Sequence, residues 1–258
     1  MGSQFATSTD GARICYEVAG NGPAIVLLHG GGQDHHVWRK AGWTDRLAAR
    51  FCVIAIDIRG NGESAKPTNP EAYSIDLLCD DILAVADAAH AQRFSLWGLS
   101  YGGNIGRYLA ARCNRVECFA MIGISFGPSA DDNFRGMIQQ MQQRWKPIID
   151  ADRAGMLDIA QIPEKDQPAW RSGQVKVMLA WLSALLEWPP VEPTDVRCPT
   201  LWVVGTANSA AMQGIKHYEG KLDGTPVQVI VVEGLTHAEE LEKVEQVLPA
   251  LLKFMIRE

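Results

Sequence analysis

The sequence predicts an α/β fold, in which a mostly parallel sheet is covered by helices on both faces and carries a helical lid insertion. Residues 24–29 (AIVLLH) and 51–57 (FCVIAID) are continuous apolar runs, which are typical of strands buried on both faces. Segments with helical spacing separate such runs along the chain, and this alternation indicates a parallel sheet. The alternation stops from about residue 129 to residue 195, where the apolar patterns are helical.

The expected elements follow one another in sequence order. An outer strand over residues 12–18 precedes the two apolar runs, and a helix ending near residue 50 separates them. Ser74 is a favourable N-cap for a helix whose apolar side chains recur from Ile75 to Ala89. Further strands are expected before residue 98 and at 116–124, 201–204 and 227–232, and a final helix is expected over residues 241–255.

The helical segment is expected to be a separate layer. We assign residues 1–128 and 196–258 to the core and residues 129–195 to the insertion, a lid over the carboxyl edge of the sheet, where ligands bind in such folds. The insertion contains four of the eight tryptophans. Trp145 and Trp181 are candidates for lining a substrate pocket. The alternative is that these aromatic side chains pack the insertion against the sheet.

The composition narrows the class of protein. The chain has 258 residues, enough for a sizeable core, and a net charge of -6 without a basic run, which argues against a nucleic-acid partner. No apolar run reaches the ~18 residues that span a membrane, and the N-terminus has no signal-peptide or myristoylation pattern. The six cysteines are scattered without a Cys-x-x-Cys pair, and we interpret them as buried, reduced side chains. We therefore expect a cytoplasmic protein with no nucleic-acid or membrane partner.

Two pentapeptides have the G-x-S-x-G pattern of a nucleophile elbow, and they are centred on Ser100 and Ser125. An elbow needs a strand before its serine and a helix of small residues directly after it. Ser100 has both, in the segment RFSLW-GLSYGG-NIGRYLAARC. Pro128 interrupts any helix directly behind Ser125, so Ser125 is expected at a strand end that leads into the insertion.

Four motifs now stand at the ends of expected strands: HGGG at 29–32, DIRGNGES at 57–64, GLSYGG at 98–103 and GLTH at 234–237. With these motifs the sequence resembles the α/β-hydrolase superfamily over nearly its full length. The resemblance implies a catalytic triad in the order nucleophile, acid, histidine. It implies that Ser100 is the nucleophile, that His237 is the base, and that the backbone N–H groups of Gly31 and Tyr101 form the oxyanion hole. No cofactor is implied.

The histidines after the HGGG turn have several interpretations. His35 and Trp38 are candidates for lining the mouth of the pocket. The spacing of His29, His35 and His36 fits no common metal site, so no metal is expected. His29 is expected to hold the turn by hydrogen bonding, and Asp57 is expected to brace the loop under the site.

The acid of the triad is the open question in this sequence. The family's usual position, three residues after the glycine that ends the penultimate strand, is occupied by Asn208. Asn208 is interpreted as the cap of the next helix, as a neutral group that orients His237, or as a sign that a carboxylate elsewhere serves the histidine. In some relatives the acid follows the strand after the elbow, where Gly123 or Ser125 stands here, and the nearest carboxylates are Asp131 and Asp132.

The predicted activity is cofactor-independent hydrolysis of a small to medium, largely apolar carboxylic ester through an acyl-enzyme. An aspartate at position 100 would have indicated a dehalogenase or an epoxide hydrolase. An enol-lactone or the carbon–carbon bond of a vinylogous diketone would use the same groups. The alternative to an enzyme is a ligand-binding protein with impaired catalysis. It is suggested by Asn208, because a neutral side chain cannot stabilise the imidazolium by charge.

Overall fold

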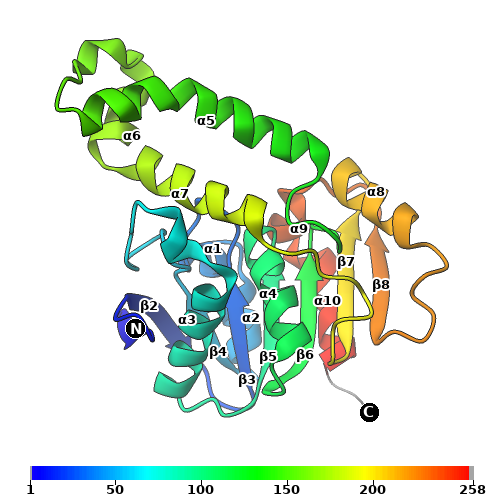
Figure 1. The fold of residues 1–258 in the computed structure, drawn as a ribbon. Helices are drawn as coiled ribbons and strands as arrows, with labels where there is room; N and C mark the ends of the chain where they lie inside the picture. The colour runs from blue at the N-terminus through cyan, green and yellow to red at the C-terminus, as the bar shows by residue number, and fades with distance from the viewer. Residues whose placement is uncertain (1, 256–258) are drawn as a thin grey trace. The chain divides into compact units, whose positions relative to one another are not determined.

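A computed structural model describes residues 2–255 and divides them into two compact units (Figure 1). The core unit contains the chain up to Ala65, Ile75–Gly127 and the chain from Pro190 onward. The helical unit contains Lys66–Ser74 and Pro128–Pro189. The boundary differs from the expected insertion in three places: residues 190–195 belong to the core unit, whereas Pro128 and residues 66–74 belong to the helical unit.

The core unit is built on an eight-stranded sheet with the order β1-β2-β4-β3-β5-β6-β7-β8. β1 and β2 are antiparallel to their neighbours, and the remaining strands are parallel. The strands are β1 (Gln4–Thr7), β2 (Arg13–Ala19), β3 (Ala24–Leu28), β4 (Cys52–Ile56), β5 (Phe94–Leu99), β6 (Val116–Ile122), β7 (Thr200–Gly205) and β8 (Val227–Val232). The predicted α/β class, a mostly parallel sheet, is confirmed.

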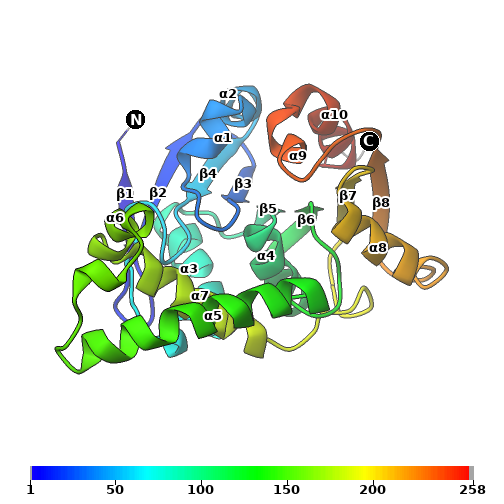
Figure 2. The ribbon, with the colours of Figure 1, turned by 90° about the horizontal axis from the view of Figure 1, so that it is seen from above.

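Helices cover both faces of this sheet, as the view from above shows (Figure 2). One face carries α1 (His36–Lys40), α2 (Trp43–Ala48), α9 (Glu239–Glu242) and α10 (Val244–Met255). The other face carries α3 (Ile75–Ala88), α4 (Tyr101–Arg112) and α8 (Ser209–Tyr218). Both faces of the central strands are therefore buried, which explains why those strands are continuous apolar runs.

A tryptophan cluster anchors the first of these faces. Trp43 packs edge to face against both Trp38 and Trp97, with ring centroids 5.9 Å apart in each pair. The Trp43 indole N–H donates a hydrogen bond of 2.7 Å to the carbonyl of Leu241. Because Leu241 lies in α9, this bond fixes the segment that follows β8, and it ties together parts of the chain that are distant in sequence.

The register of the parallel strands brings several loops to one edge of the sheet. Leu28 of β3 pairs with Gly98 of β5, and Leu99 of β5 pairs with Ile122 of β6. Ile122 in turn pairs with Val203 of β7. The loops that leave the carboxyl ends of these strands therefore start side by side, and this edge is where parallel sheets place their sites.

The helical unit has a small core of its own. It comprises the short helix η1 (Pro70–Tyr73), α5 (Asp132–Arg153), η2 (Ile159–Gln161), η3 (Glu164–Asp166), α6 (Gln167–Arg171) and α7 (Gln174–Glu187). Trp145 and Trp170 stack with centroids 5.7 Å apart at an interplanar angle of 7°. The Trp188 indole N–H donates a 3.1 Å hydrogen bond to the Tyr73 carbonyl. This contact explains why residues 66–74 join the unit, although no local pattern in the sequence indicates it.

Strand β1 was not expected, because only Ala6 of its four residues is buried and so short a segment shows no clear alternation.

Between residues 2 and 255, no helix combines the length and the apolar character needed to cross a membrane.

Candidate active site

Ser100 stands on a strained turn between β5 and α4. Its φ of 51° and ψ of −116° lie in a region that side-chain-bearing residues rarely adopt, at a cost of about 1–3 kcal/mol. The flanking glycines make the turn possible. A Cβ at Gly98 would lie 2.5 Å from the Gly102 carbonyl oxygen, and a Cβ at Gly102 would collide with the Leu28 carbonyl. The turn therefore requires the small residues that the sequence places two positions before and after the serine.

The HGGG turn lies beside this serine. The amide of Gly102 donates a 3.1 Å hydrogen bond to the His29 carbonyl, and a Cβ added at Gly30 would lie 3.6 Å from Ser100 Cβ. His29 is fully buried, with Nδ1 2.7 Å from the Gly30 carbonyl and Nε2 accepting a 3.0 Å bond from the Ile58 amide. Burial lowers the pKa of His29, so its ring is neutral. The expectation that His29 holds the turn by hydrogen bonding is confirmed.

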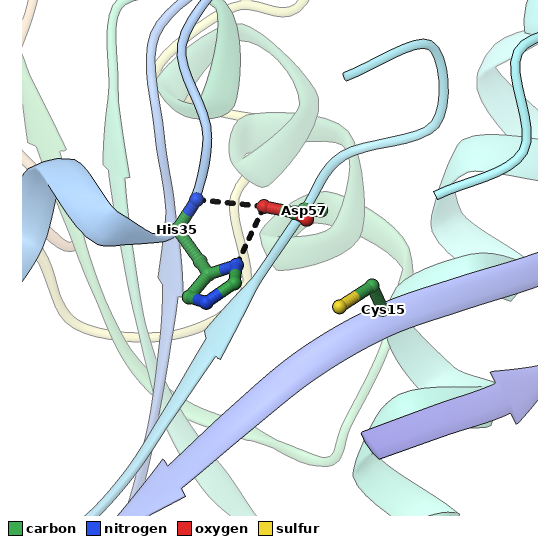
Figure 3. Close-up of side chains that lie close together, drawn as sticks. All are labelled: Cys15, His35 and Asp57. Atoms are coloured by element: carbon green, nitrogen blue, oxygen red, sulfur yellow. Dashed lines mark hydrogen bonds and ion pairs between the residues drawn. The ribbon is translucent and has the colours of Figure 1, made fainter. Parts of the chain in front are cut away.

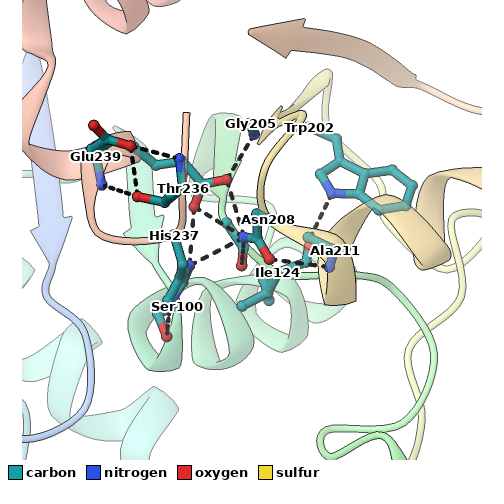
Figure 4. Close-up of polar contacts among 11 residues, drawn as sticks. Ser100, Ile124, Trp202, Gly205, Asn208, Ala211, Thr236, His237 and Glu239 are labelled. Carbon is teal, nitrogen blue, oxygen red and sulfur yellow. Dashed lines mark hydrogen bonds and ion pairs between the residues drawn. The ribbon is translucent and has the colours of Figure 1, made fainter. Parts of the chain in front are cut away.

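His237 follows β8 and reaches back to the elbow (Figure 4). Its Nε2 lies 3.1 Å from Ser100 Oγ, which is hydrogen-bond distance. The loop that carries His237 packs closely on β7, because a Cβ at Gly205 would collide with the Leu235 carbonyl. The strand-end position of His237, which indicated it in the sequence, thus places the imidazole against the serine hydroxyl.

The carboxylate beside His237 is Glu240, a residue that the sequence analysis did not single out. Glu240 Oε2 lies 3.0 Å from His237 Nδ1, the ring nitrogen that faces away from Ser100. Glu240 Oε1 accepts a 2.8 Å hydrogen bond from the Gly205 amide. The Glu240 side chain is fully buried, so its oxygens depend on these partners for hydrogen bonds. Ser100, His237 and Glu240 thus have the contacts of a nucleophile, a base and an orienting acid.

Glycine at position 123 leaves room for this pair. Gly123 follows β6 with a φ of 76°. A Cβ at that position would collide with Glu240 Oε2 and would lie 2.8 Å from His237 Nδ1. The strand end where some relatives carry the acid is therefore filled here by the side chain of Glu240.

Asn208 has two roles in the structure. Its Oδ1 caps α8 by accepting a 3.3 Å bond from the Ala211 amide, as one of the interpretations expected. Its Nδ2 donates to the Gly123 carbonyl at 3.1 Å and to the two Glu240 oxygens at 3.1 and 3.2 Å. The same Nδ2 lies 3.2 Å from His237 Nδ1. The residue in the usual acid position thus contacts both the histidine and the carboxylate.

Asp131, the alternative acid, has a different partner. It is the N-cap of α5 in the helical unit, and its Oδ1 accepts a 2.7 Å bond from the Phe134 amide. Asp132 is the first residue of the same helix. The carboxylate in contact with His237 is Glu240, and not a residue of this loop as one alternative expected. A sequence signal for Glu240 did exist, since it stands at helical spacing three residues after His237.

His35 and Trp38 do not lie at the mouth of a pocket, and this expectation is corrected. Trp38 is fully buried in the apolar core of the first sheet face, and His35 is 3% exposed. Trp38 lies in the short helix α1 and contacts Trp43, and His35 is the N-cap residue of the same helix. Trp145 is also buried and is stacked on Trp170 inside the helical unit, whereas Trp181 of α7 is half-buried.

His35 is instead the partner of Asp57 (Figure 3). Asp57 Oδ1 lies 2.7 Å from both the backbone amide and Nδ1 of His35, and Oδ2 accepts a 2.7 Å bond from the Glu63 amide. Burial opposes ionisation of Asp57, but the hydrogen bonds from His35 and Glu63 outweigh it and lower the pKa to about 2. The hydrogen bond to Asp57 raises the pKa of His35. Asp57 thus braces two loops, as expected.

Two overlapping groups of side chains near His35 have the composition of metal ligands. Cys15, His35 and Asp57 offer atoms within 4.8 Å of one another, as do Glu17, His35 and His36. In the first group the Asp57 oxygens already accept hydrogen bonds from His35 and Glu63, and burial raises the pKa of the Cys15 thiol to about 12. In the second, Glu17 forms an ion pair of 3.1 Å with Arg39. In each group, the carboxylate thus already has a hydrogen-bond or ion-pair partner.

Ser125, in the second G-x-S-x-G pentapeptide, has no elbow geometry. It follows β6 and packs against α8, where a Cβ at Gly214 would collide with its Oγ. Its carbonyl accepts a 2.9 Å bond from the fully buried Arg107. The two pentapeptides thus differ in what surrounds them, as the sequence context predicted.

Comparisons with known proteins agree with this architecture. A family model described as "alpha/beta hydrolase fold" matches residues 23–205. Bifunctional epoxide hydrolase 2 of Sus scrofa is 32% identical over 121 residues, which cover 46% of this chain and 21% of that protein. The chain spans less than half of the length of the curated relatives that it matches.

Two solved structures share the fold over almost the whole chain. A thermophilic esterase from Thermogutta terrifontis has a TM-score of 0.73 at 20% identity, covering 99% of this chain and 98% of its own. The enol-lactonase from Burkholderia xenovorans LB400 has a TM-score of 0.69 at 21% identity, covering 98% of this chain and 100% of its own. At such identities the likeness shows the fold.

Proposed function

Since the chain belongs to the α/β-hydrolase fold family, we propose that it is a serine hydrolase that cleaves a small to medium, largely apolar carboxylic ester. The observation that carries the proposal is the chain of contacts from Ser100 Oγ to His237 Nε2 at 3.1 Å and from His237 Nδ1 to Glu240 Oε2 at 3.0 Å. A serine hydroxyl attacks poorly at neutral pH, and this arrangement supplies the base that it needs.

In the proposed mechanism Ser100 Oγ attacks the ester carbonyl while His237 Nε2 takes its proton. The amides of Gly31 and Tyr101 donate to the oxyanion of the tetrahedral intermediate. The imidazolium then protonates the leaving alcohol, and an acyl-enzyme remains on Ser100. Water, deprotonated by His237, attacks this ester and releases the acid. Glu240 holds the ring orientation and stabilises the imidazolium at both steps.

The nucleophile favours ester chemistry over epoxide chemistry. Attack of a carboxylate on an epoxide gives an ester, which water can hydrolyse. Attack of Ser100 on an epoxide would give an ether, which the groups of this site cannot hydrolyse. The serine therefore favours an acyl substrate over the epoxide named for the Sus scrofa relative. A lactone is an internal ester and fits the same mechanism.

Glu240 also bears on the alternative of a binding protein with impaired catalysis. That alternative depended on the neutral side chain of Asn208 in the acid position. A buried carboxylate 3.0 Å from His237 Nδ1 favours catalysis over this alternative, because the histidine has a carboxylate partner even though Asn208 is neutral.

Hydrolysis of short-chain nitrophenyl esters by the wild-type protein and the Ser100→Ala variant tests the proposal. We expect turnover by the wild type and a loss of at least about 10³-fold in kcat/KM in the variant. Ser125→Ala is the matched control, because it removes the same hydroxyl from the other pentapeptide and should retain activity. Activity that survives in Ser100→Ala would refute the mechanism.

A further inference from the structure

Asn208 contacts both oxygens of Glu240, and its orientation is fixed. Because Oδ1 accepts from the Ala211 amide, Nδ2 must face the Gly123 carbonyl and the carboxylate. Its distances to Oε1 and Oε2 are 3.1 and 3.2 Å. Both side chains are buried, Glu240 fully and Asn208 to 7% exposure, so water does not compete strongly for these bonds. The amide is therefore a fixed donor to the carboxylate.

The two side chains reach the same atom of His237. Glu240 Oε2 lies 3.0 Å from His237 Nδ1, and Asn208 Nδ2 lies 3.2 Å from it. When Nδ1 carries the proton, only an oxygen can accept from it, so the contact with Nδ2 is not a hydrogen bond. An oxygen at the place of Nδ2, which aspartate would supply, would be within hydrogen-bond distance of Nδ1.

We propose that Asn208 is a positioning residue that holds Glu240 against His237, and that positions 208 and 240 are interchangeable sites for one negative charge. The inference rests on the proposed function. It follows from the shared atom: an aspartate at 208 and a glutamine at 240 can restore the bond from His237 Nδ1–H to a carboxylate. The glutamine oxygen can still accept from the Gly205 amide, and its NH₂ group can donate to the introduced aspartate.

The same geometry explains why both positions do not carry charge. Two carboxylates about 3 Å apart cannot both be ionised near neutral pH. An aspartate at 208 and Glu240 would therefore share an extra proton. With that proton between the two carboxylates, the aspartate oxygen that faces the Gly123 carbonyl would have no hydrogen to donate to it. His237 is the titratable group in contact with Glu240, whereas the adjacent Glu239 bonds Thr236. Asn208→Asp alone is expected to slow the reaction.

The test measures phosphonylation by a fluorophosphonate, which needs no knowledge of the natural substrate. Ser100 Oγ forms a bond to phosphorus, fluoride leaves, and His237 takes the proton. Relative to the wild type, we expect Glu240→Gln to be slower by about 10³-fold or more and Asn208→Asp to be slower by about tenfold. The double variant Asn208→Asp/Glu240→Gln, called the exchange variant, should be at least about tenfold faster than Glu240→Gln. Its rate should stay below that of the wild type, because the aspartate oxygen faces the Gly123 carbonyl.

Asn208→Ser/Glu240→Gln is the matched control. Serine retains an N-cap acceptor for α8 but brings no charge, so this variant should remain as slow as Glu240→Gln. Asn208→Ser alone should be about tenfold slower than the wild type, because it loses the donor to the carboxylate. A folded exchange variant no faster than Glu240→Gln would overturn the proposal. If the exchange variant does not fold, an unchanged rate in Asn208→Ser would overturn it.

A second readout separates this inference from the proposed function. The downfield proton resonance of His237 Nδ1–H reports the hydrogen bond to a carboxylate without any reaction. It should be present in the wild type, lost in Glu240→Gln and restored in the exchange variant. Absence of labelling at Ser100 in the wild type would count against the proposed function. A resonance that the exchange variant does not restore would count against the interchange.

Discussion

Glu240 Oε2 lies 3.0 Å from His237 Nδ1, and the two residues are separated by one helical turn on the same segment. The histidine and the acid therefore come from one loop and one short helix, which the Trp43 bond to Leu241 fixes. Of the three residues, only Ser100 comes from a distant part of the chain, and the turn between β5 and α4 fixes its place.

Glu240→Gln should lower kcat/KM for a nitrophenyl ester by about 10³–10⁴-fold, as expected when a triad loses its charged member. The amide has nearly the same shape, so the loss reflects charge and tautomer. Ester hydrolysis monitored by nitrophenolate release gives the measurement.

Glu239→Gln is the control for this variant, because Glu239 is adjacent in sequence and its carboxylate bonds the Thr236 amide and hydroxyl. Its kcat/KM should stay close to the wild type. Equal losses in the two variants would assign the effect to the loop rather than to the contact with His237.

Gly123→Ala should lower kcat/KM by about 10²-fold, because the new methyl group would displace the Glu240 and His237 side chains. Gly127→Ala separates this effect from backbone strain. Gly127 also has a positive φ, of 89°, and a Cβ added there would lie 3.0 Å from the Tyr218 hydroxyl. Both variants should be destabilised, and only Gly123→Ala should lose activity. Full activity in Gly123→Ala would contradict the packing described here.

The pair of His35 and Asp57 should make stability depend on pH in a defined direction. The pKa of His35 is raised in the folded protein by its hydrogen bond to Asp57. The contribution of His35 to the free energy of unfolding is therefore complete below about pH 6.5, the pKa of histidine in the unfolded chain. It is lost as pH rises through the higher pKa of the folded protein. Urea unfolding of the wild type and His35→Gln should show a stability difference that shrinks from acidic to alkaline pH.

His36→Gln is the comparison for that measurement. His36 is the exposed neighbour of His35, with ring centroids 4.0 Å apart. It has no bond to Asp57, so His36→Gln should keep the pH-dependent contribution of His35 to stability that His35→Gln loses. A stability difference for His35→Gln that grows with pH would contradict the assigned pair.

Much of the fold was predictable because the central strands are buried on both faces. Burial on both faces produces continuous apolar runs, and the runs at β3 and β4 are visible without any structure. The Ser100 elbow was predictable for a steric reason, since the collisions at Gly98 and Gly102 are local to the motif.

Glu240 was not predictable by the same means. Glu239 and Glu240 are identical residues side by side, and they differ in that one bonds Thr236 whereas the other is buried against His237. Tertiary packing makes that distinction, and hydropathy does not contain it. Trp38 was misplaced for a related reason, because a helix of five residues is too short to show which of its faces is buried.

The most direct test of the account is the site of covalent labelling by a fluorophosphonate, located by peptide mass spectrometry. We expect a single adduct on Ser100 in the wild type and in Ser125→Ala, and none in Ser100→Ala. An adduct on Ser125, or labelling that persists in Ser100→Ala, would contradict the assignment of Ser100 as the nucleophile.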